Sequence, residues 1–400
     1  MTKNKALYGL PEDVKFCSKC VISNQRPSSV VEFKQQITQI KPTIEFDDKN
    51  VCSACLFQEK KKNIINWKDR EKELIDLLDR FRRKDGSFDC IVPGSGGKDS
   101  RYVSHILKYK YNMNPLTVTW TPHDYTDIGR FNFESWHEDG FSNILLSPNR
   151  KLHKYLTKEA FKNLLHPFQP FIVGQRISGA LIAKKYKIPL IFYGENQAEY
   201  GNNISENDTP FMKEDFFSSN NDLHSIYLSG KTISQHLEEN SNFRVSDFNF
   251  YLPLDDIDFD IKYAYLGYFI NWDPQEVYYY TVENTGFRPS TFRTPGSFSR
   301  YSSIDDKIDL LHYYTTYIKF GIGRATYDAA QEIRNNKITR EEGISLVKKF
   351  DHELDEKKLL DCLDYMDIKI DDFQEIIDKG RSPHLWKKNN NKWELLHKVY

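Results

Sequence analysis

The feature that most constrains this chain is a glycine-rich turn between an apolar segment and a helical pattern. Residues 89–93 (DCIVP) run directly into a glycine-rich tetrapeptide, and a helix is predicted from about Asp99. Glycines let backbone N–H groups converge on an anion without interference from Cβ atoms, and the following helix adds its unpaired N–H groups and positive dipole end. The turn therefore predicts a phosphate site, although such turns also serve packing alone. The candidate phosphate-binding residues are Gly94, Ser95, Gly96, Gly97, Lys98, Asp99 and Ser100.

The residue after the glycine–lysine pair decides which kind of phosphate loop is predicted. A Walker A loop needs Ser or Thr there, whereas Asp99 follows Lys98 in this chain. The string S-G-G-K-D-S instead resembles the PP-loop of the adenine-nucleotide α-hydrolase group, which includes argininosuccinate synthetase, asparagine synthetase and tRNA lysidine synthetase. The resemblance implies cleavage of ATP between its α- and β-phosphates, with the loop holding the departing pyrophosphate. Lys98 and Asp99 are candidate catalytic residues; Asp99 is either a ligand of Mg²⁺ or a plain helix N-terminal acid.

Short apolar runs alternate with helical patterns after the glycine loop. Strands are predicted at 115–120, 142–147 and 188–196, and helices around 127–138 and within 152–187. Strands separated by helices indicate an α/β fold with a parallel, doubly wound sheet. Together with the loop, this pattern predicts a fold like that of the adenine-nucleotide α-hydrolases.

The other patterns are mainly helical. Apolar residues recur at three- and four-residue spacing over 64–85, Pro274 is suited to opening a helix, and 303–335 is long enough for two helices broken by glycines. Thr339 and Glu342 form a predicted capping box. Residues 199–260 are rich in asparagine and acids, and we interpret them as an insertion or lid. The predicted domains are a zinc-knuckle segment (1–62), a PP-loop nucleotide-binding domain (63–198), the insertion or lid (199–260) and a helical C-terminal region that completes the substrate site (261–400).

Four of the six cysteines fall in two C-x-x-C pairs, a spacing typical of a tetrahedral zinc site. A closed site with four thiolates leaves no position for substrate, so Zn²⁺ is expected to be structural. Reduced free thiols, an iron–sulfur cluster and a redox pair are the alternatives. Cys90 and Cys362 are interpreted as packing residues. The candidate metal ligands are Cys17, Cys20, Cys52 and Cys55.

Composition narrows the range of partners and compartments. The 56 basic and 57 acidic side chains give a net charge of −1, so the total charge provides no general attraction to nucleic acid or to an anionic membrane. No apolar run reaches the roughly 20 residues of a membrane helix, and the N-terminal segment lacks the apolar run of a secretory signal. Sparse cysteines in paired motifs suit a reducing compartment. We therefore expect a cytoplasmic protein with neither a membrane nor a nucleic acid as its partner.

Polar residues at the end of the last predicted strand are further site candidates. Glu195 and Asn196 follow that strand and should lie at the carboxyl edge of the sheet, where open α/β sheets bind ligands. Glu195 is a third candidate catalytic residue, which would hold Mg²⁺ or orient the nucleophile, and Asn196 is a candidate for binding a substrate amide. Arg176 opens a preceding helix and is a candidate phosphate ligand. The alternative for Glu195 is an acid that caps a loop, and the alternative for Arg176 is an ordinary surface salt bridge.

Two C-terminal segments supply the remaining substrate-binding candidates. The first mixes arginines with aromatic residues and prolines, which suits bidentate contacts with anionic or sugar groups, although a solvated loop is an equal alternative. The second interrupts a helix with glycines and favours a backbone that faces a ligand. Asp305 and Asp306 are interpreted as helix N-terminal acids. The candidates are Arg288, Arg293 and Arg300 in the first segment, and Lys319 and Arg324 beside Gly321 and Gly323 in the second.

These segments together resemble the bacterial N-acetyl sugar amidotransferases of surface-polysaccharide (O-antigen or capsule) and flagellin-glycan biosynthesis. The resemblance spans nearly the whole chain and rests on CSKCVISNQRPSS and FDDKNVCSAC ahead of PGSGGKDS, then YGEN and SSIDDKIDLLHYYTTYIKFGIGRATYDAAQEIRNNKITREEG. It implies Mg²⁺-dependent transfer of AMP from ATP to the acetamido oxygen of an N-acetylated, nucleotide-linked sugar. Attack by ammonia then gives the acetamidino sugar. A separate glutaminase and a cyclase-like companion are implied as the ammonia source, and Thr2 leaves no N-terminal cysteine for glutamine hydrolysis.

Two other classes of protein share some of these features. A PP-loop enzyme that thiolates tRNA or forms lysidine would have the same loop and zinc knuckles, but it should also show catalytic cysteines or a basic appendage, and neither is evident. A zinc-knuckle binding module without catalysis leaves the glycine loop unexplained. The sugar amidotransferase interpretation accounts for the most residues.

Overall fold

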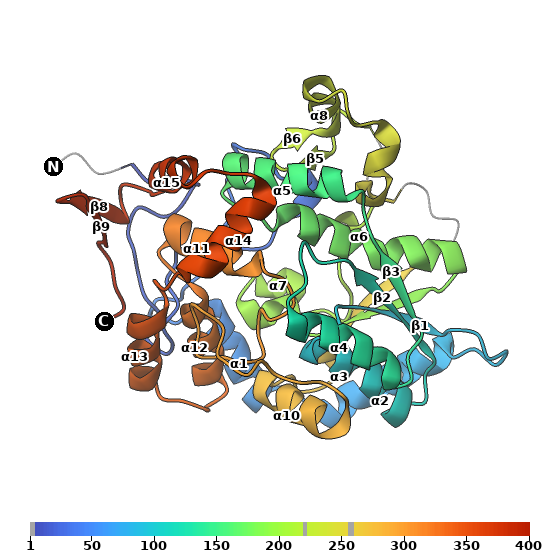
Figure 1. Ribbon diagram of the computed structural model, residues 1–400. Coiled ribbons are helices and arrows are strands. Elements are labelled where there is room, and N and C mark those ends of the chain that lie inside the picture. Colours follow the sequence, from blue (N-terminus) through green and yellow to red (C-terminus); the bar gives the residue numbers. More distant parts are fainter. Residues whose placement is uncertain (1–4, 219–221, 255–259) are drawn as a thin grey trace.

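A five-stranded parallel sheet forms the centre of the computed structural model, which describes residues 5–218, 222–254 and 260–400 (Figure 1). The strand order is β3-β2-β1-β4-β7, and every neighbouring pair is parallel. The chain runs outward from β1 in both directions, so the carboxyl end of β1 is a topological switch point. The predicted α/β class and parallel sheet are confirmed. The strands are β1 (Cys90–Pro93), β2 (Pro115–Trp120), β3 (Asn143–Leu146), β4 (Leu190–Tyr193) and β7 (Lys262–Tyr265).

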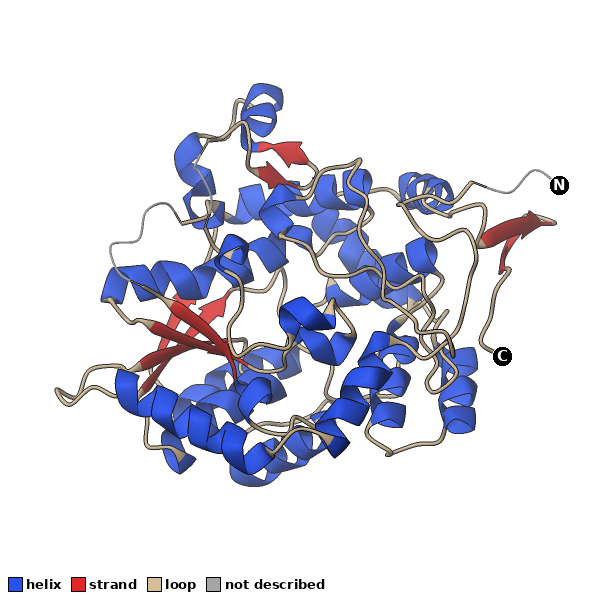
Figure 2. Cartoon of the chain, turned by 180° about the vertical axis from the view of Figure 1, so that it is seen from behind, coloured by secondary structure: helices blue, strands red, loops and turns tan. Residues whose placement is uncertain are grey.

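Helices cover both faces of the sheet because its central strands are apolar on both sides. All residues of β1 and β2 are buried, as expected for parallel strands between two helical layers. Successive side chains of a strand point to opposite faces. Ile91 accordingly belongs to the core cluster that contains Ala180 of α6 (Gln169–Tyr186), whereas Val92 belongs to the cluster that contains Leu78 of α2 (Trp67–Phe81). Figure 2 shows the strands enclosed between these helices.

The predicted elements around the sheet are present, with shifted bounds. All four predicted strands occur, and the helix expected over 64–85 is α2, which begins three residues later and ends at Phe81. The predicted capping box is present, since Thr339 and Glu342 exchange side-chain and backbone hydrogen bonds at the start of α13. The two C-terminal helices are separated as predicted, and Gly321 adopts φ +68° between them. The remaining elements of this group are α3 (Lys98–His105), α4 (Asp127–Glu138), α5 (Arg150–Leu164), α10 (Pro274–Asn284), α11 (Asp309–Phe320), α12 (Arg324–Arg334) and α13 (Arg340–Phe350).

Several elements were not predicted, and two of them bear on the sheet and the cysteine segment. Strand β7 pairs with β4 as the fifth strand of the sheet, although residues 262–265 follow the asparagine-rich segment. Helix α1 (Ser53–Asn63) begins within the second cysteine pair, with Cys52 as its N-cap. The further elements are α7 (Ile204–Asn207), α8 (Ile233–Glu239), α9 (Leu266–Phe269), α14 (Glu356–Met366), α15 (Ile370–Lys379), β5 (Tyr227–Leu228), β6 (Lys231–Thr232), β8 (Trp386–Asn389), β9 (Lys392–Leu395), a π-helical turn (Ile106–Lys110) and 3-10 turns at Glu32–Lys34, Gln197–Tyr200, Glu214–Phe216 and Val245–Tyr251.

The segment interpreted as an insertion or lid contributes side chains to the core. Phe217 is fully buried and its ring stacks on that of Tyr263 in β7, with ring centroids 3.7 Å apart. Phe248 and Tyr251 are fully buried in one cluster with Trp120 of β2. Residues 219–221 and 255–259 of this segment lie outside the described residues. The proposed domain boundaries remain predictions.

The N-terminal segment packs against the C-terminal helices rather than standing apart. In Figure 1 the blue N-terminal chain runs among the orange and red helices α11 to α13. One core cluster combines the four paired cysteines with Phe320 at the end of α11, Ala329 in α12 and Val347 in α13. The two ends of the sequence therefore share one apolar core.

Candidate functional site

The glycine loop lies at the switch point and is wound tightly between β1 and α3. The Gly94 N–H donates to the Val118 carbonyl oxygen at 2.9 Å, which extends the pairing of β1 with β2 to the start of the loop. Gly96 adopts φ +83°, a conformation that favours glycine. Among the described residues, the N–H groups of Ser95, Gly96 and Gly97 have no hydrogen-bond acceptor. These groups and the N-terminus of α3 form a site suited to an anion.

A fully buried arginine fixes the loop to α4. The Arg101 guanidinium donates to the Gly96 carbonyl oxygen at 3.2 Å and to the Asn132 carbonyl oxygen. It also pairs with Asp139 at 2.5 Å. Burial lowers the pKa of Arg101 to about 10, and the Asp139 carboxylate opposes that shift. Arg101 remains charged at neutral pH and holds the loop in place.

The three predicted catalytic residues lie together at the carboxyl edge of the sheet. Lys98 is 7% exposed, and its ammonium group pairs with Asp99 at 2.5 Å. Glu195, just after β4, accepts a hydrogen bond from the Tyr200 hydroxyl. Burial raises the pKa of Glu195, the negative charge of Asp99 raises it further, and Lys98 opposes both. Asp99 and Glu195 offer the carboxylate oxygens that Mg²⁺ prefers. Their roles remain predictions.

The helix N-terminal role predicted for Asp305 and Asp306 holds only for Asp306, which accepts a hydrogen bond from the Ile308 N–H at 2.9 Å in the turn before α11 begins at Asp309. Asp305 instead accepts a hydrogen bond from the Ser95 hydroxyl and so lies across the glycine loop. Burial raises the pKa of Asp305 to about 6. Asp306 accepts a hydrogen bond from the His123 backbone N–H at 2.7 Å and pairs with the His123 ring at 2.8 Å. No local pattern indicates these contacts, because they join residues about 200 positions apart in the chain.

A cavity of about 390 Å³ lies beside the loop and is the candidate active site. Its wall comes from the segment around the cysteine pairs, the start of α3, the turn between α5 and α6, the turn after β4, the start of α10, the loop before α11, and the helices α11 and α12. Clefts of this size at the switch point of a parallel sheet commonly bind nucleotides and small molecules. The charged and aromatic side chains of the wall include Arg26, Glu32, Lys41, Lys98, Asp99, Glu195, Tyr200, Tyr301, Lys319, Arg324, Tyr327, Asp328, Glu332 and Arg334.

Lys319 and Arg324 are the two predicted substrate-binding residues that line this cavity. The Lys319 ammonium group is buried and donates to the Leu164 carbonyl oxygen at 3.0 Å. Burial, and then the positive charge of Lys41, lowers the pKa of Lys319 to about 7. Arg324 pairs with Asp328 at 3.0 Å, one turn further along α12.

The other predicted substrate-binding residues do not line the cavity. The Asn196 side chain is used within the turn, because it accepts from the Ala198 N–H at 2.8 Å and donates to a carbonyl oxygen. Arg176 lies over the rings of Tyr193 and Phe216. Arg293 is engaged by Glu353, with both of its terminal nitrogens 2.6 Å from carboxylate oxygens.

Two further arginines of the first C-terminal segment also lie elsewhere. Arg300 is exposed and donates to the Ser290 carbonyl oxygen at 3.0 Å. Arg288 lies over the ring of Phe131, 4.3 Å from its centroid. No substrate contact is assigned to either.

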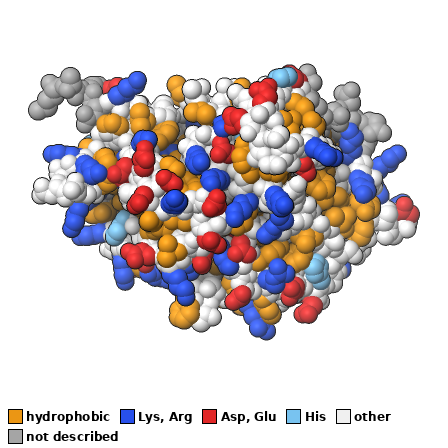
Figure 3. Space-filling view, turned by 45° about the horizontal axis from the view of Figure 1, so that its top comes forward, with side chains coloured by type: hydrophobic (Ala, Val, Ile, Leu, Met, Phe, Trp, Pro, Cys, Tyr) orange, Lys and Arg blue, Asp and Glu red, His pale blue; other side chains and the backbone are white. Residues whose placement is uncertain are grey.

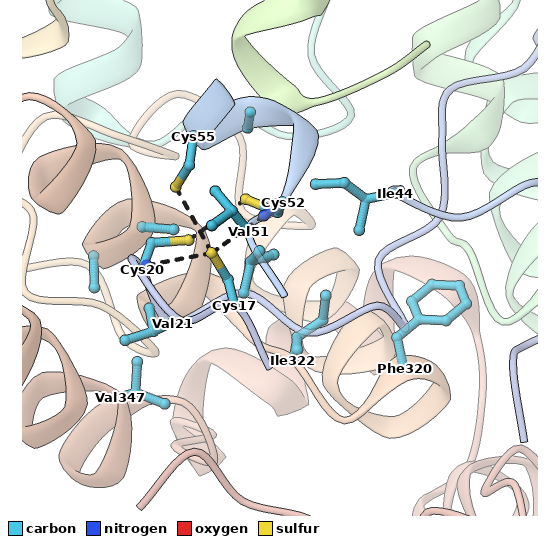
Figure 4. Packing of buried hydrophobic residues seen from close by; sticks show 14 of the residues in the cluster. Cys17, Cys20, Val21, Ile44, Val51, Cys52, Cys55, Phe320, Ile322 and Val347 are labelled. Atoms are coloured by element: carbon cyan, nitrogen blue, oxygen red, sulfur yellow. Dashed lines mark hydrogen bonds between the residues drawn. The ribbon is translucent and has the colours of Figure 1, made fainter. Parts of the chain in front are cut away.

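The four paired cysteines converge on one point, as Figure 4 shows. All their sulfur atoms lie within 4.8 Å of one another, and the Cys17–Cys55 and Cys20–Cys52 Sγ distances are both 3.8 Å. Thiolates placed about 2.3 Å from a tetrahedral zinc ion stand about 3.8 Å apart. The geometry therefore fits structural Zn²⁺ held by four thiolates.

Local hydrogen bonds and a distant arginine position these sulfur atoms. The N–H groups of Lys19, Cys20 and Cys52 point at the Cys17 sulfur, at 3.3 to 3.4 Å. Arg340 at the start of α13 donates to the carbonyl oxygens of Cys17 and Cys20. The cluster thus joins the N-terminal segment to α13.

Comparison with known proteins supports the assignment of the C-terminal region. Residues 295–400 match the C-terminal domain of the WbpG-like lipopolysaccharide (LPS) biosynthesis proteins. Over 81 residues, the chain is 33% identical to an uncharacterized protein of Methanocaldococcus jannaschii; the match covers 20% of this chain and 28% of that protein. The first match includes Lys319, Arg324 and Asp328 of the cavity wall.

The surface and the helices add two general observations. Positive and negative side chains are interspersed over the face shown in Figure 3, which agrees with a net charge near zero. In the described part of the chain, no helix has the length and apolar character needed to cross a membrane.

Proposed function

We propose that this chain is an ATP-dependent amidotransferase of surface-polysaccharide biosynthesis, acting on an N-acetylated sugar. It would transfer AMP to the acetamido oxygen, release pyrophosphate and exchange the activated oxygen for ammonia, which gives an acetamidino sugar. The observation that carries the proposal is one shared cavity: Lys98, Asp99 and Glu195 of the nucleotide edge face residues 295–400, the region that matches the WbpG-like proteins.

The residues present suit each part of this reaction. The free N–H groups of the glycine loop and the Lys98 ammonium group would bind the pyrophosphate portion of ATP. Asp99 and Glu195 would hold Mg²⁺, which neutralises phosphate charge when bound. An amide oxygen is a poor leaving group. Its attack on the α-phosphorus of ATP would release pyrophosphate and give an O-adenylyl imidate, and attack of ammonia on the imidate carbon would then break the C–O bond and release AMP together with that oxygen.

The nitrogen source follows from the same proposal. No described cysteine lies free in the cavity wall, because the four paired cysteines form the metal cluster and Cys90 and Cys362 are buried in the core. We therefore propose that ammonia comes from a separate glutaminase with a cyclase-like companion. The isolated chain should use ammonium salts, with activity that rises toward about pH 9 as the ammonia fraction increases, and should use glutamine only when the partner is added.

The decisive experiment is a product assay with the purified chain, ATP, Mg²⁺, ammonium and a set of N-acetylated nucleotide sugars. AMP, pyrophosphate and an amidine should appear together. Lys98→Ala should slow turnover by about 10²-fold or more, since Lys98 stabilises charge on the leaving group. Lys72→Ala is the matched control: Lys72 lies on α2, is 73% exposed and pairs only with Asp69.

Two outcomes would contradict the proposal. Release of ADP that depends on the sugar would exclude cleavage between the α- and β-phosphates. AMP release without any amidine, together with AMP transfer to tRNA, would favour the tRNA-modifying class instead.

A further inference from the structure

Arg26 is a buried cation in the cavity wall that forms no ion pair with a carboxylate of the described residues. It is 8% exposed, and its Nη1 atom is buried without a hydrogen-bond acceptor. In the described part of the chain, no carboxylate forms an ion pair with Arg26, whereas Arg324 and Lys98 in the same wall are paired with Asp328 and Asp99. A buried charge without a partner is unfavourable, so such groups normally meet a counter-ion or a ligand.

The surroundings of Arg26 hold its guanidinium in place without neutralising it. The group lies over the rings of Tyr200 and Tyr327, 5.8 and 5.7 Å from their centroids. The backbone around it is fixed as well, because the Ile44 N–H donates to the Arg26 carbonyl oxygen at 2.9 Å. Tyr200 is also the residue that donates to Glu195, so Arg26 lies one side chain away from the predicted catalytic residues.

Other cations of the wall also lack carboxylate partners in the described chain. The Arg334 side chain donates to the Glu199 carbonyl oxygen at 3.4 Å and forms no ion pair with a described carboxylate, although burial is opposed by the charges of the cysteine cluster and of Glu199, which raise its pKa. Its own charge lies close enough to lower the pKa of Arg26, after the larger effect of burial. The ammonium group of Lys319 donates to a carbonyl oxygen. On the N-terminal segment, α11 and α12, the wall carries five lysines or arginines (Arg26, Lys41, Lys319, Arg324 and Arg334) and three carboxylates (Glu32, Asp328 and Glu332). This side of the cavity therefore has an excess of positive charge, and it is separate from the glycine loop, which has its own donors for pyrophosphate.

We propose that Arg26 binds a phosphate or carboxylate group of the sugar substrate, so that the cavity selects acidic acceptors over neutral N-acetylated sugars. The planar guanidinium can donate two parallel hydrogen bonds to either group. This inference rests on the proposed function for the identity of the ligand as a sugar. It also gives the cysteine segment a part in substrate binding, since Arg26 lies between the two cysteine pairs.

Equilibrium binding tests the proposal without requiring turnover. Wild-type protein, Arg26→Gln and Arg26→Lys are titrated calorimetrically with three probes and, separately, with α,β-methylene-ATP and Mg²⁺. UDP-N-acetylglucosamine carries a diphosphate, N-acetylneuraminic acid carries a carboxylate, and N-acetylglucosamine is neutral. Arg80→Gln is the matched control, because Arg80 lies exposed on α2 and donates to the Asp76 carbonyl oxygen of its own helix.

Arg26→Gln should weaken binding of an anionic probe on the order of 10- to 100-fold, with unchanged binding of the neutral probe and the ATP analogue. The affinity of Arg26→Lys for the anionic probe should lie between those of wild type and Arg26→Gln, because lysine keeps the positive charge but cannot donate two parallel hydrogen bonds. Loss with the diphosphate probe alone identifies phosphate as the group bound, and loss with the carboxylate probe alone identifies carboxylate. Retained binding of the ATP analogue shows that a variant is folded.

Three results would overturn the proposal: wild-type protein that binds no anionic probe more tightly than the neutral one, equal affinities in wild type and Arg26→Gln, or a loss confined to the ATP analogue. The product assay tests the proposed function independently of these titrations, because a wrong function would leave AMP and amidine unformed whatever the binding results.

Discussion

Replacement of Gly96 by alanine tests how closely the glycine loop approaches α4. A Cβ atom at this position would lie 2.7 Å from the Asn132 carbonyl oxygen and 3.1 Å from the Phe133 Cα atom, both in the backbone of α4. The φ of +83° adds a second penalty. The left-handed conformation costs about 1–2 kcal/mol in a residue with a Cβ atom, and overpacking against a backbone that cannot rotate away costs about 1–3 kcal/mol.

Gly86 provides a matched control for the cost of the left-handed backbone conformation alone. It has φ +79°, and an added Cβ atom would meet nothing within 4 Å. Gly86→Ala should therefore lose only about 1–2 kcal/mol of unfolding free energy, whereas Gly96→Ala should lose about 2–5 kcal/mol. The difference of about 1–3 kcal/mol reports the contact with α4 alone.

Urea unfolding followed by tryptophan fluorescence measures both variants, and a titration with α,β-methylene-ATP measures the loop itself. Gly96→Ala should weaken nucleotide binding because the loop must move away from α4, and Gly86→Ala should not. Equal destabilisation of the two variants would refute the close approach of loop and helix. Wild-type nucleotide affinity in Gly96→Ala would show that the loop does not bind phosphate in this conformation.

The metal cluster and the cationic cavity wall give two further expectations. Purified protein should contain about one zinc ion per chain, and Cys52→Ser should lower its zinc content and solubility together. Cys362→Ser changes a buried thiol outside the cluster and should leave both unchanged. Full zinc content in Cys52→Ser would rule out a site of four thiolates. Lys319 is protonated below its pKa of about 7 and neutral above it, and the nearby His166 and His312 stay neutral because burial holds their pKa values lower still. Burial also raises the pKa of Glu332 in the same wall to about 7, and its ionisation adds negative charge over the same range. Affinity for UDP-N-acetylglucosamine, whose diphosphate stays ionised, should therefore fall from about pH 6 to about pH 8. Lys319→Met should reduce this pH dependence and leave the part due to Glu332, and an unchanged profile in that variant would exclude Lys319 from the anion site.

Local sequence patterns predicted the elements whose conformation depends on residues close to one another in the chain. The strand before Gly94 is apolar on both faces, and the capping box at Thr339 depends on residues three positions apart, so both were visible in the sequence. Strand β7 was missed because its four residues follow an acidic stretch and become a strand only by pairing with β4, about 70 positions earlier in the chain. Helix α1 was missed because its polar residues form no clear apolar stripe.

The site was predicted where it depends on the glycine loop and was incomplete where it depends on distant partners. Asp305 follows two serines and reads as a helix N-terminal acid, yet it contacts Ser95, 210 positions away. Arg293 has the surroundings of a ligand-binding arginine, but Glu353 already satisfies it. Arg26 carried no signal of its own, because what distinguishes it is the lack of a carboxylate partner among the described residues, in a cavity built from many separate segments.

The packing of the cysteine segment against α12 and α13 determines when this part of the molecule can fold. The hydrogen bond from Arg340 to the Cys17 carbonyl oxygen joins residues 323 positions apart. The Cys cluster also shares its apolar core with Trp386. Contacts of such high sequence separation slow folding, because a long loop must close before they form. During synthesis the cysteine segment leaves the ribosome before α12 and α13, so its apolar face stays uncovered until these helices follow, and the cavity that it shares with α12 is completed late.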